Sequence, residues 1–582
     1  MGYFIVVWIC LTIICCVIGT AFLNIVSGHC FNSRSNHFIA AFWLGLMLLC
    51  ISLLATSLIL PLSTAVGATI AFGLTALSLL SSGVRTRMLW LLSGLTPSLT
   101  LCLFALIIIV ALSFTPKMSW FDTGVYHLGI IKWLSKYGAV PGITLINPKF
   151  GFTSSWFALA APLTPEAIGS RIGAITNGFI VWMAIVQLLI CWIKTLEKRS
   201  RISDWFLLSF FSISISLYAL KFSTSPILVS FTADIAVTFL IGLTAWSILI
   251  ISDDRQSSHK LSTAAVKSSI LDARIIPLIL SCGAVTLKLS AFPLLPVTFL
   301  YYIWGPKINI QRILGGVTTI FLLLLPMILF GVITSGCPLY PSTAMCLDTP
   351  WLITKQQAIE EASEVQFWWK LVDEDVSGVT FLLLGFLRWL QGSINSQMMI
   401  ALLVASFVLS FWILRTAEHG NNRGYIWLIG IGFLGMSFIM IKGPLIRFGL
   451  GYFILVSSLS LAHYGLFQLT KMKLGVARLF SFVFRGGRPS KLIPLGFLLL
   501  LGFTTATVDS GDVQARLILP LELPIAPIEA RQVNDVKYVY PLYPYYKACW
   551  GAKLPCAPEP IENNIKLRNP SQGLGAGFVQ AK

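Results

Sequence analysis

Asp122 is the residue whose position best suits chemistry. It follows a long apolar run and begins a stretch with helical spacing, residues 122–137. A carboxylate there can accept a proton from an acceptor hydroxyl, or it can cap the helix by accepting backbone N–H bonds; the two roles are compatible. Tyr126 shares the helical face of Asp122, whereas His127 is turned away by roughly 140°. His127 is a second candidate for proton transfer, acceptor binding or metal ligation, and otherwise an interfacial polar residue.

Donor side chains near the ends of apolar runs are candidate ligands for an anion. Lys149, Ser154 and Ser155 lie in NPKFGFTSSWF and can donate hydrogen bonds to a phosphate or to sugar hydroxyls. The alternative is an interfacial lysine, with serines that cap the following helix. Arg447, in GPLIRFGLGY, suits bidentate contacts to a phosphate. Its alternative is an arginine at a helix end whose charge reaches the headgroups.

Two further cations, Arg171 and Lys288, lie at or near membrane depth in the sequence pattern. A charge there costs at least about 2.5–3.5 kcal/mol, so each should have a partner. Asp234, in SFTADIAV, is the candidate partner. A pair of Asp234 with either cation would fix helix packing, or the three residues would belong to a cavity that receives an anion. The sequence contains no P-loop, H-E-x-x-H or G-x-S-x-G motif.

The composition excludes a soluble enzyme. Of 582 residues, 56% are hydrophobic and 11% are charged, and the mean hydropathy is +0.83; soluble domains carry about 25% charged residues. Apolar runs of about 20 residues, the length that crosses the hydrocarbon layer, recur along the chain. We therefore predict an all-α polytopic membrane protein with about 12–14 transmembrane helices and interfacial helices in its exoplasmic loops. The predicted spans are 3–27, 38–60, 64–82, 96–114, 172–193, 204–221, 229–251, 312–334, 397–414, 425–441, 449–467 and 492–508.

One apolar stretch, residues 275–304, is interrupted by Lys288 and three prolines. We expect two short half-helices that form a hairpin. Broken backbone at membrane depth is tolerated only where protein or a wet cavity covers it.

Orientation follows from the distribution of Lys and Arg. Basic clusters at 194–201, 255–274 and 471–491 mark cytoplasmic linkers. Alternating the spans from these clusters places the C-terminal tail outside. The net charge of +18 then reflects topology and contact with anionic lipid. No basic stripe interleaved with aromatics is present, so nucleic acid is not an expected partner.

Three regions follow from this topology. Residues 1–95 are N-terminal transmembrane helices, and residues 96–508 are a transmembrane core with exoplasmic loops 115–170 and 335–396. Residues 509–582 are an exoplasmic Pro- and Tyr-rich tail, which we expect to be irregular. Two cysteine pairs in the outer regions are expected to form disulfides in an oxidising compartment: Cys337 with Cys346, and Cys549 with Cys556.

An Asp on an interfacial helix just outside a span resembles the GT-C class of polytopic glycosyltransferases. A wider set of motifs resembles a little-characterised bacterial multi-pass membrane family, from about residue 96 onward: DTGVYH, KYGAVPG, NPKFGFTSSWF, TLKLS, SGCPLYPS, RFG and CWGAKLPC. Two GT-C features are missing, because Asp122 is followed by Thr123 rather than a second acid, and no Lys-Pro-Pro-Leu loop occurs.

The resemblance implies inverting transfer of a sugar from a polyprenyl-phosphate donor to an acceptor hydroxyl, in surface polysaccharide or glycoconjugate assembly. Asp122 would be the base, with His127 beside it, and Lys149, Lys288 and Arg447 would hold the lipid phosphate. No metal site is predicted, although a divalent metal stays open as a cofactor. Expected partners are membrane lipid, the lipid-linked sugar and a glycan, lipid or protein acceptor, at a bacterial plasma (inner) membrane. The alternatives are a transporter or flippase for a lipid-linked or anionic solute, and a noncatalytic membrane assembly protein.

Overall fold

The computed structural model describes residues 1–26, 31–221, 227–259, 271–304, 309–365, 378–417, 422–471, 513–542 and 548–581. Within these residues, 10 helices are long and apolar enough to cross a membrane, or 11 if one bent pair counts as a single span. The all-α polytopic fold is therefore confirmed. The 10 helices are α1 (Gly2–Ile25), α2 (Arg34–Ser57), α5 (Pro97–Phe114), α8 (Ile175–Leu196), α9 (Ile202–Lys221), α10 (Asp234–His259), α13 (Ile310–Ser335), α16 (Ile394–Thr416), α17 (Asn422–Lys442) and α18 (Ile446–Lys471). The predicted span at 492–508 lies outside the described residues.

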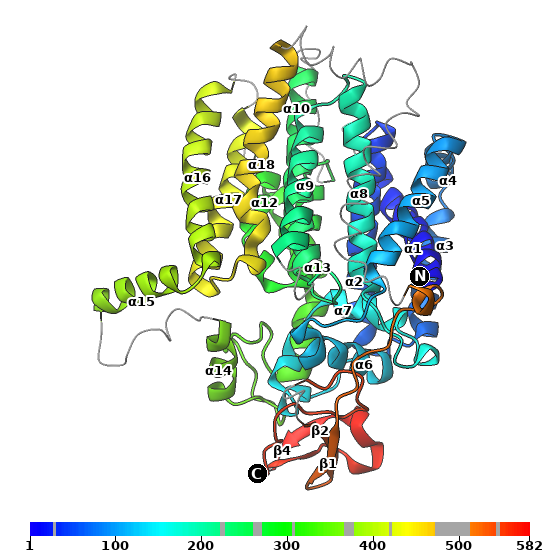
Figure 1. Cartoon of the computed structure of the whole chain (residues 1–582), viewed down its shortest axis with the longest axis vertical. Helices are drawn as coiled ribbons and strands as arrows, with labels where there is room; N and C mark the ends of the chain where they lie inside the picture. The colour runs from blue at the N-terminus through cyan, green and yellow to red at the C-terminus, as the bar shows by residue number, and fades with distance from the viewer. Residues whose placement is uncertain are drawn as a thin grey trace.

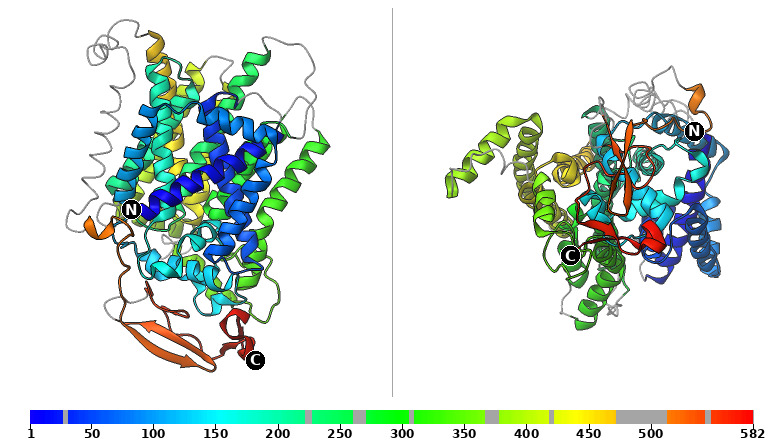
Figure 2. Two further views of the ribbon diagram at one scale, coloured as in Figure 1. Left: turned by 90° about the vertical axis from the view of Figure 1, so that its right-hand side faces the viewer. Right: turned by 90° about the horizontal axis from the view of Figure 1, so that it is seen from below.

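The long helices form a bundle, and the main loops gather at one end of it (Figure 1). We call this the loop end; it carries residues 115–174, 336–354 and the tail 513–581. The views in Figure 2 agree that the strands of the tail lie beyond the helices, across the loop end. The helix α15 (Gly378–Gly392) projects sideways from the bundle beside α16, while α14 (Lys355–Val365) lies at the loop end.

Two glycines allow α1 and α2 to pack with their backbones in contact. A methyl group on Gly45 would lie 1.8 Å from the carbonyl oxygen of Cys15, and one on Gly19 would lie 1.8 Å from that of Ala41. Small residues at a crossing are the usual means of close approach between membrane helices, where packing replaces the hydrophobic effect. The α1–α2 pair thus forms a tight base for the N-terminal part of the bundle.

One predicted span, 64–82, and the predicted hairpin, 275–304, are each divided into two helices. Residues 64–82 form α3 (Thr64–Leu79), which is followed after a 100° bend by α4 (Ser82–Leu92). The stretch 275–304 forms α11 (Ile275–Leu287) and α12 (Leu294–Ile303), joined by the short turn η6 (Leu289–Ala291). This second break agrees with the expected hairpin of half-helices.

The loop end consists of short helices covered by the tail. Residues 115–174 form the π-turn η1 (Thr123–His127), α6 (Leu128–Tyr137), α7 (Ser155–Ala160) and the 3-10 turns η2 (Ile143–Leu145), η3 (Pro148–Gly151), η4 (Ala161–Leu163) and η5 (Glu166–Ile168). The apolar stripe of α6 is covered by protein rather than by headgroups, since Trp133 is 1% exposed and its ring packs on Phe578 of the tail.

The tail is more ordered than we expected from its sequence. It contains two antiparallel pairs, β1 (Ile528–Val533) with β2 (Val536–Pro541), and β3 (Ile565–Leu567) with β4 (Phe578–Gln580). It also has the turns η10 (Gln514–Arg516) and η11 (Pro570–Ala576). Both cysteine pairs are joined, Cys337 to Cys346 and Cys549 to Cys556.

The α1–α2 crossing gives a first prediction. Gly45→Ala should lower stability by about 1–3 kcal/mol or more, because the added methyl overlaps the backbone of α1. Gly73→Ala is the matched control, since Gly73 on α3 has open space at that position; it should be neutral or slightly stabilising. Thermal unfolding of both variants in detergent measures the difference. Equal unfolding temperatures would show that the close crossing is not required.

Candidate functional site

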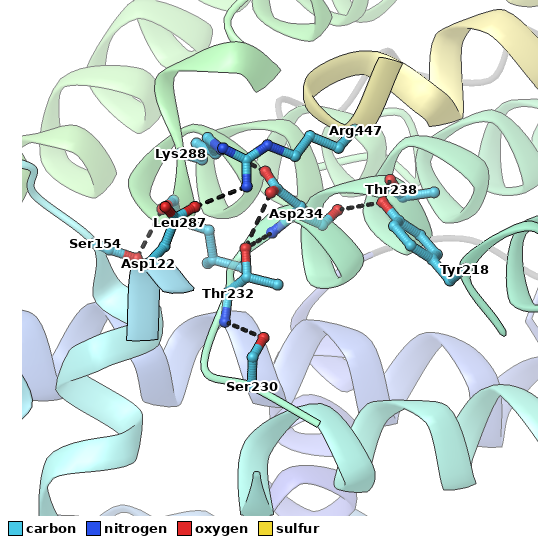
Figure 3. Close-up of polar contacts among 10 residues, drawn as sticks. All are labelled: Asp122, Ser154, Tyr218, Ser230, Thr232, Asp234, Thr238, Leu287, Lys288 and Arg447. Carbon is cyan, nitrogen blue, oxygen red and sulfur yellow. Dashed lines mark hydrogen bonds and ion pairs between the residues drawn. The ribbon is translucent and has the colours of Figure 1, made fainter. Parts of the chain in front are cut away.

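Four charged side chains from distant parts of the chain meet at the loop end of the bundle (Figure 3). Arg447 donates to Asp122 over 2.7 Å, and Lys288 forms an ion pair with Asp234. Arg447 also interacts electrostatically with Asp234, and Lys288 with Asp122, so the two pairs form one network. We call these residues the charge cluster. Sequence reasoning named all four but predicted only the Lys288–Asp234 pair as one of its options.

Helix ends position three of the four charges. Asp234 is the first residue of α10, Arg447 is the second residue of α18, and Lys288 follows the last residue of α11. A carboxylate at a helix N-terminus and a cation at a C-terminus are each favoured by the helix dipole. The two acids and two bases of the cluster give a net charge of zero. The N-termini of α10 and α18 add partial positive charge and the C-terminus of α11 adds partial negative charge.

A π-turn positions Asp122, which is the residue just before η1. Asp122 makes no side-chain capping bond, so the expected cap is wrong, and its carboxylate binds Arg447 instead. The backbone N–H of Leu128 bonds to the carbonyl of Thr123, five residues earlier. His127, at the other end of the turn, acts electrostatically on Asp122.

Serines hold the broken helix that presents Lys288. Ser154 donates to the carbonyl of Leu287 over 2.7 Å, and Ser155 bonds to Thr286 over 2.9 Å. Both serines are buried. Their hydroxyls thus satisfy groups at the C-terminal end of α11, where the helix stops and Lys288 takes an extended conformation. We predicted them as substrate ligands; the structure places them in support of Lys288.

The partner of Lys288 is held from its own side. Asp234 is 3% exposed, and it accepts a 3.0 Å hydrogen bond from Thr232. Tyr218 bonds to Thr238 one turn further along α10 over 2.9 Å. Lys288 pairs with one carboxylate oxygen of Asp234, and the bond from Thr232 satisfies the other. Thr232 was missed from the sequence, although the Thr-x-Asp spacing at a helix start is a signal that points to it.

Aromatic rings surround the cations, which are open to an incoming ligand. The side chains of Arg447 and Lys288 are 22% and 29% exposed. The Phe448 ring centroid lies 4.0 Å from the ammonium of Lys288 and 5.0 Å from the guanidinium of Arg447, and Trp120 lies 5.3 Å from the same guanidinium. Neither aromatic was singled out from sequence. Rings of this kind hold a cation without neutralising it, so the charge stays available to an anion.

The surroundings of Asp122 and His127 shift the pKa of both side chains. Burial alone would raise the pKa of Asp122. Arg447 and His127 together lower it by more than burial raises it, so its pKa is below the ordinary value. Asp122 is therefore ionised near neutral pH. Burial lowers the pKa of His127 to about 4, which leaves it neutral there. Its ring contacts Thr123, Tyr126 and Phe157.

Other predicted site residues lie beside the cluster or apart from it. Tyr126 packs its ring on Phe152 as well as on His127. Lys149 contacts Glu361 and Glu364 of α14, at 2.7 Å each, and so links two loops. Arg171 is 40% exposed and lies 3.6 Å from Glu522 of the tail. The expected pairing of Arg171 with Asp234 is therefore wrong. Within the described residues, no group of three His, Cys, Asp or Glu side chains is placed to hold a metal.

One family model matches the chain, that of a domain of unknown function, DUF8201, over residues 1–454. The chain belongs to the DUF8201 family. The matched region contains all four residues of the charge cluster in this DUF8201 protein, and it ends before the tail. No curated protein and no solved structure matches the chain.

The buried His127 gives a prediction for pH dependence. Its pKa in the folded DUF8201 protein is about 4, against 6.5 ordinarily, so between these values the unfolded chain binds a proton that the folded chain does not. Its contribution to stability is present above pH 6.5 and is lost as the pH falls toward 4, by about 3 kcal/mol in total.

His127→Gln keeps a hydrogen-bonding side chain but cannot be protonated. The wild type should therefore lose about 3 kcal/mol more stability than this variant between pH 7 and pH 4. Denaturant unfolding followed by tryptophan fluorescence measures both. Parallel loss in the two proteins would mean that His127 titrates normally.

Proposed function

We propose that this DUF8201 protein is a glycosyltransferase that moves a sugar from a polyprenyl-phosphate donor to an acceptor hydroxyl at its loop end. The observation that supports this most is the contact of Asp122 with Arg447 beside Lys288. It brings a carboxylate, which can act as a base, to cations that can bind a phosphate. The multi-pass fold implies lipid contact, which such a donor requires. In this proposal the loop end faces the exoplasm, and the membrane is a bacterial inner membrane.

The donor phosphate would compete with Asp122 for Arg447. Phosphate oxygens match a guanidinium in the same two-point geometry as a carboxylate, and the phosphate gains negative charge as the sugar leaves. Donor binding would then move Arg447 and Lys288 onto the phosphate and leave the Asp122 carboxylate for the acceptor. A base that is paired in the resting protein becomes available only when the donor is present.

The transfer step follows from this exchange. Asp122 takes the proton of the acceptor hydroxyl while the hydroxyl oxygen attacks the anomeric carbon of the donor sugar. The bond from that carbon to the phosphate oxygen breaks, and polyprenyl phosphate leaves with the electron pair, stabilised by Arg447 and Lys288. Inversion results from the single displacement. Asp122 then releases its proton to water. With a pKa below its ordinary value, Asp122 acts by position more than by basicity.

Asp122→Asn is the direct test. In proteoliposomes supplied with radiolabelled sugars on undecaprenyl phosphate and an acceptor extract, transfer should fall by about 10²–10⁴-fold at unchanged protein level. Glu166→Gln, an exposed acid in the same loop, is the matched control and should keep activity. Transfer by Asp122→Asn at the wild-type rate, or no transfer by the wild type from any donor in the panel, would overturn the proposal.

Arg447→Lys tests the phosphate contact separately. The variant keeps the charge but loses the planar fork, so the apparent KM for the donor should rise about tenfold, with a smaller change in kcat. Arg531→Lys, which changes a tail residue paired with Glu529, is the control. An unchanged KM would remove the phosphate role from Arg447.

The same variants distinguish a transporter. The Lys288–Asp234 pair lies in the bundle, and a solute path through the bundle would depend on it more than on Asp122. Under that alternative, Lys288→Met and Asp234→Asn would abolish flux of a labelled anionic solute into liposomes while Asp122→Asn stays mild. Under the transferase proposal, loss of transfer with Asp122→Asn occurs without any such flux.

A further inference from the structure

The disulfide loop of the tail rests directly on the π-turn that carries Asp122. The backbone N–H of Trp550 donates to the carbonyl of Gly124 over 3.2 Å, and the ammonium of Lys132 donates to the carbonyl of Ala552 over 2.9 Å. Trp550 and Ala552 both lie between Cys549 and Cys556. Trp550 is 6% exposed, so this contact is sealed from solvent. The tail thus reaches residues that are more than 400 positions earlier in the chain.

The fit between Trp550 and Gly124 is too close for any larger residue. A Cβ on Gly124 would lie 2.5–2.9 Å from three atoms of the indole. Gly124 is two residues from Asp122 and three from His127. A shift of the indole therefore displaces the backbone of the turn, which carries both side chains.

The backbone of the π-turn bonds to the tail. The i→i+5 bond from Leu128 to Thr123 departs from the regular helical ladder, and the carbonyl of the next residue, Gly124, accepts from the backbone N–H of Trp550. Turns of this kind are rare, and here the tail supplies a contact to the carbonyl of one of its residues.

The loop is also fixed on its far side. Val539 of β2 donates to Pro555 and accepts from Ala557, at 3.1 Å each. The disulfide then closes the eight residues 549–556 into one rigid unit. In space this unit lies between β2 and the π-turn. Burial also lowers the pKa of Lys132, whose ammonium bonds to the loop, to about 8.

We propose that the Cys549–Cys556 loop is a clamp that sets the geometry of the π-turn, with Trp550 as the positioning residue for Asp122. The clamp itself follows from contacts within the protein; its effect on sugar transfer rests on the proposed function. Removing the clamp should let the turn relax toward an ordinary α-helix, which changes the direction of the Asp122 side chain and loosens the Asp122–Arg447 contact.

Hydrogen–deuterium exchange tests the clamp without any assay of activity. In the purified full chain, Trp550→Ala and the double variant Cys549→Ser with Cys556→Ser should make the amides of residues 123–128 exchange about tenfold faster. Trp550→Phe, which keeps a ring against Gly124, should give a smaller increase. Trp304→Ala, at a residue 68% exposed just after α12, is the matched control. Peptides from α8 should not change in any variant.

A double-mutant cycle separates the contact from general loss of stability. Gly124→Ala should raise exchange at the turn by displacing the indole, and adding it to Trp550→Ala should raise exchange no further, because both changes remove one contact. Unchanged exchange at residues 123–128 in Trp550→Ala, or simple addition of the two effects, would overturn the clamp.

The consequence for transfer has its own readout. With Trp550→Ala, kcat should fall while the KM for undecaprenyl-phosphate sugar stays within about twofold, since Arg447 and Lys288 remain. The acid limb of the pH–rate profile should move to higher pH, because Asp122 loses the cation that holds its pKa down. If the wild type shows no transfer but the amides of the variants exchange faster, the proposed function is wrong and the clamp is still supported. If the amides of Trp550→Ala exchange faster but the acid limb of its pH–rate profile does not move, Trp550 does not position Asp122.

Discussion

The pairing of four charges at the end of an apolar bundle is the constraint on which the rest of the structure depends. Asp234 is almost fully buried, and an ionised carboxylate in that position is tolerable only with a cation against it. Lys288 supplies that charge only if α11 stops where it does. Arg447 on α18 and Asp122 in the loop after α5 form the second ion pair of the cluster. Moving any of these segments along its neighbour would leave a charge unpaired.

Several features of the loop end serve that balance. Ser154, just before α7, donates to the last residue of α11. Tyr452 of α18 donates to the carbonyl of Ser290 over 3.2 Å, and Thr232 donates to Asp234. These contacts join three helices and one loop around the cluster. The result is a rigid setting for the side chains, and rigidity is what allows a weakly basic carboxylate to contribute through position.

The sequence predicts the helices, the broken hairpin and the residue types of the site, but of the contacts within the charge cluster it offers only the Lys288–Asp234 pair, as one option. Apolar length and proline position are local signals, so α11, α12 and most long helices could be placed in advance. The π-turn could not, because the helical spacing of 122–137 is compatible with an ordinary helix and the distortion depends on a partner in the tail. The pairing of Asp122 with Arg447 joins residues 325 positions apart, and no local pattern encodes it. Lys149 illustrates the same point, since the acids that bind it lie on another loop.

The separation of Asp122 and Arg447 along the chain has a consequence for biogenesis. Membrane segments are inserted in the order in which they are synthesised, so Asp122 is placed long before α18 exists to neutralise it. Asp234 already has Lys288 by then, but Asp122 has no cation against it until α18 arrives. A chain truncated before α18 would keep that uncompensated acid at the bilayer surface. The ion pair would then report that insertion is complete.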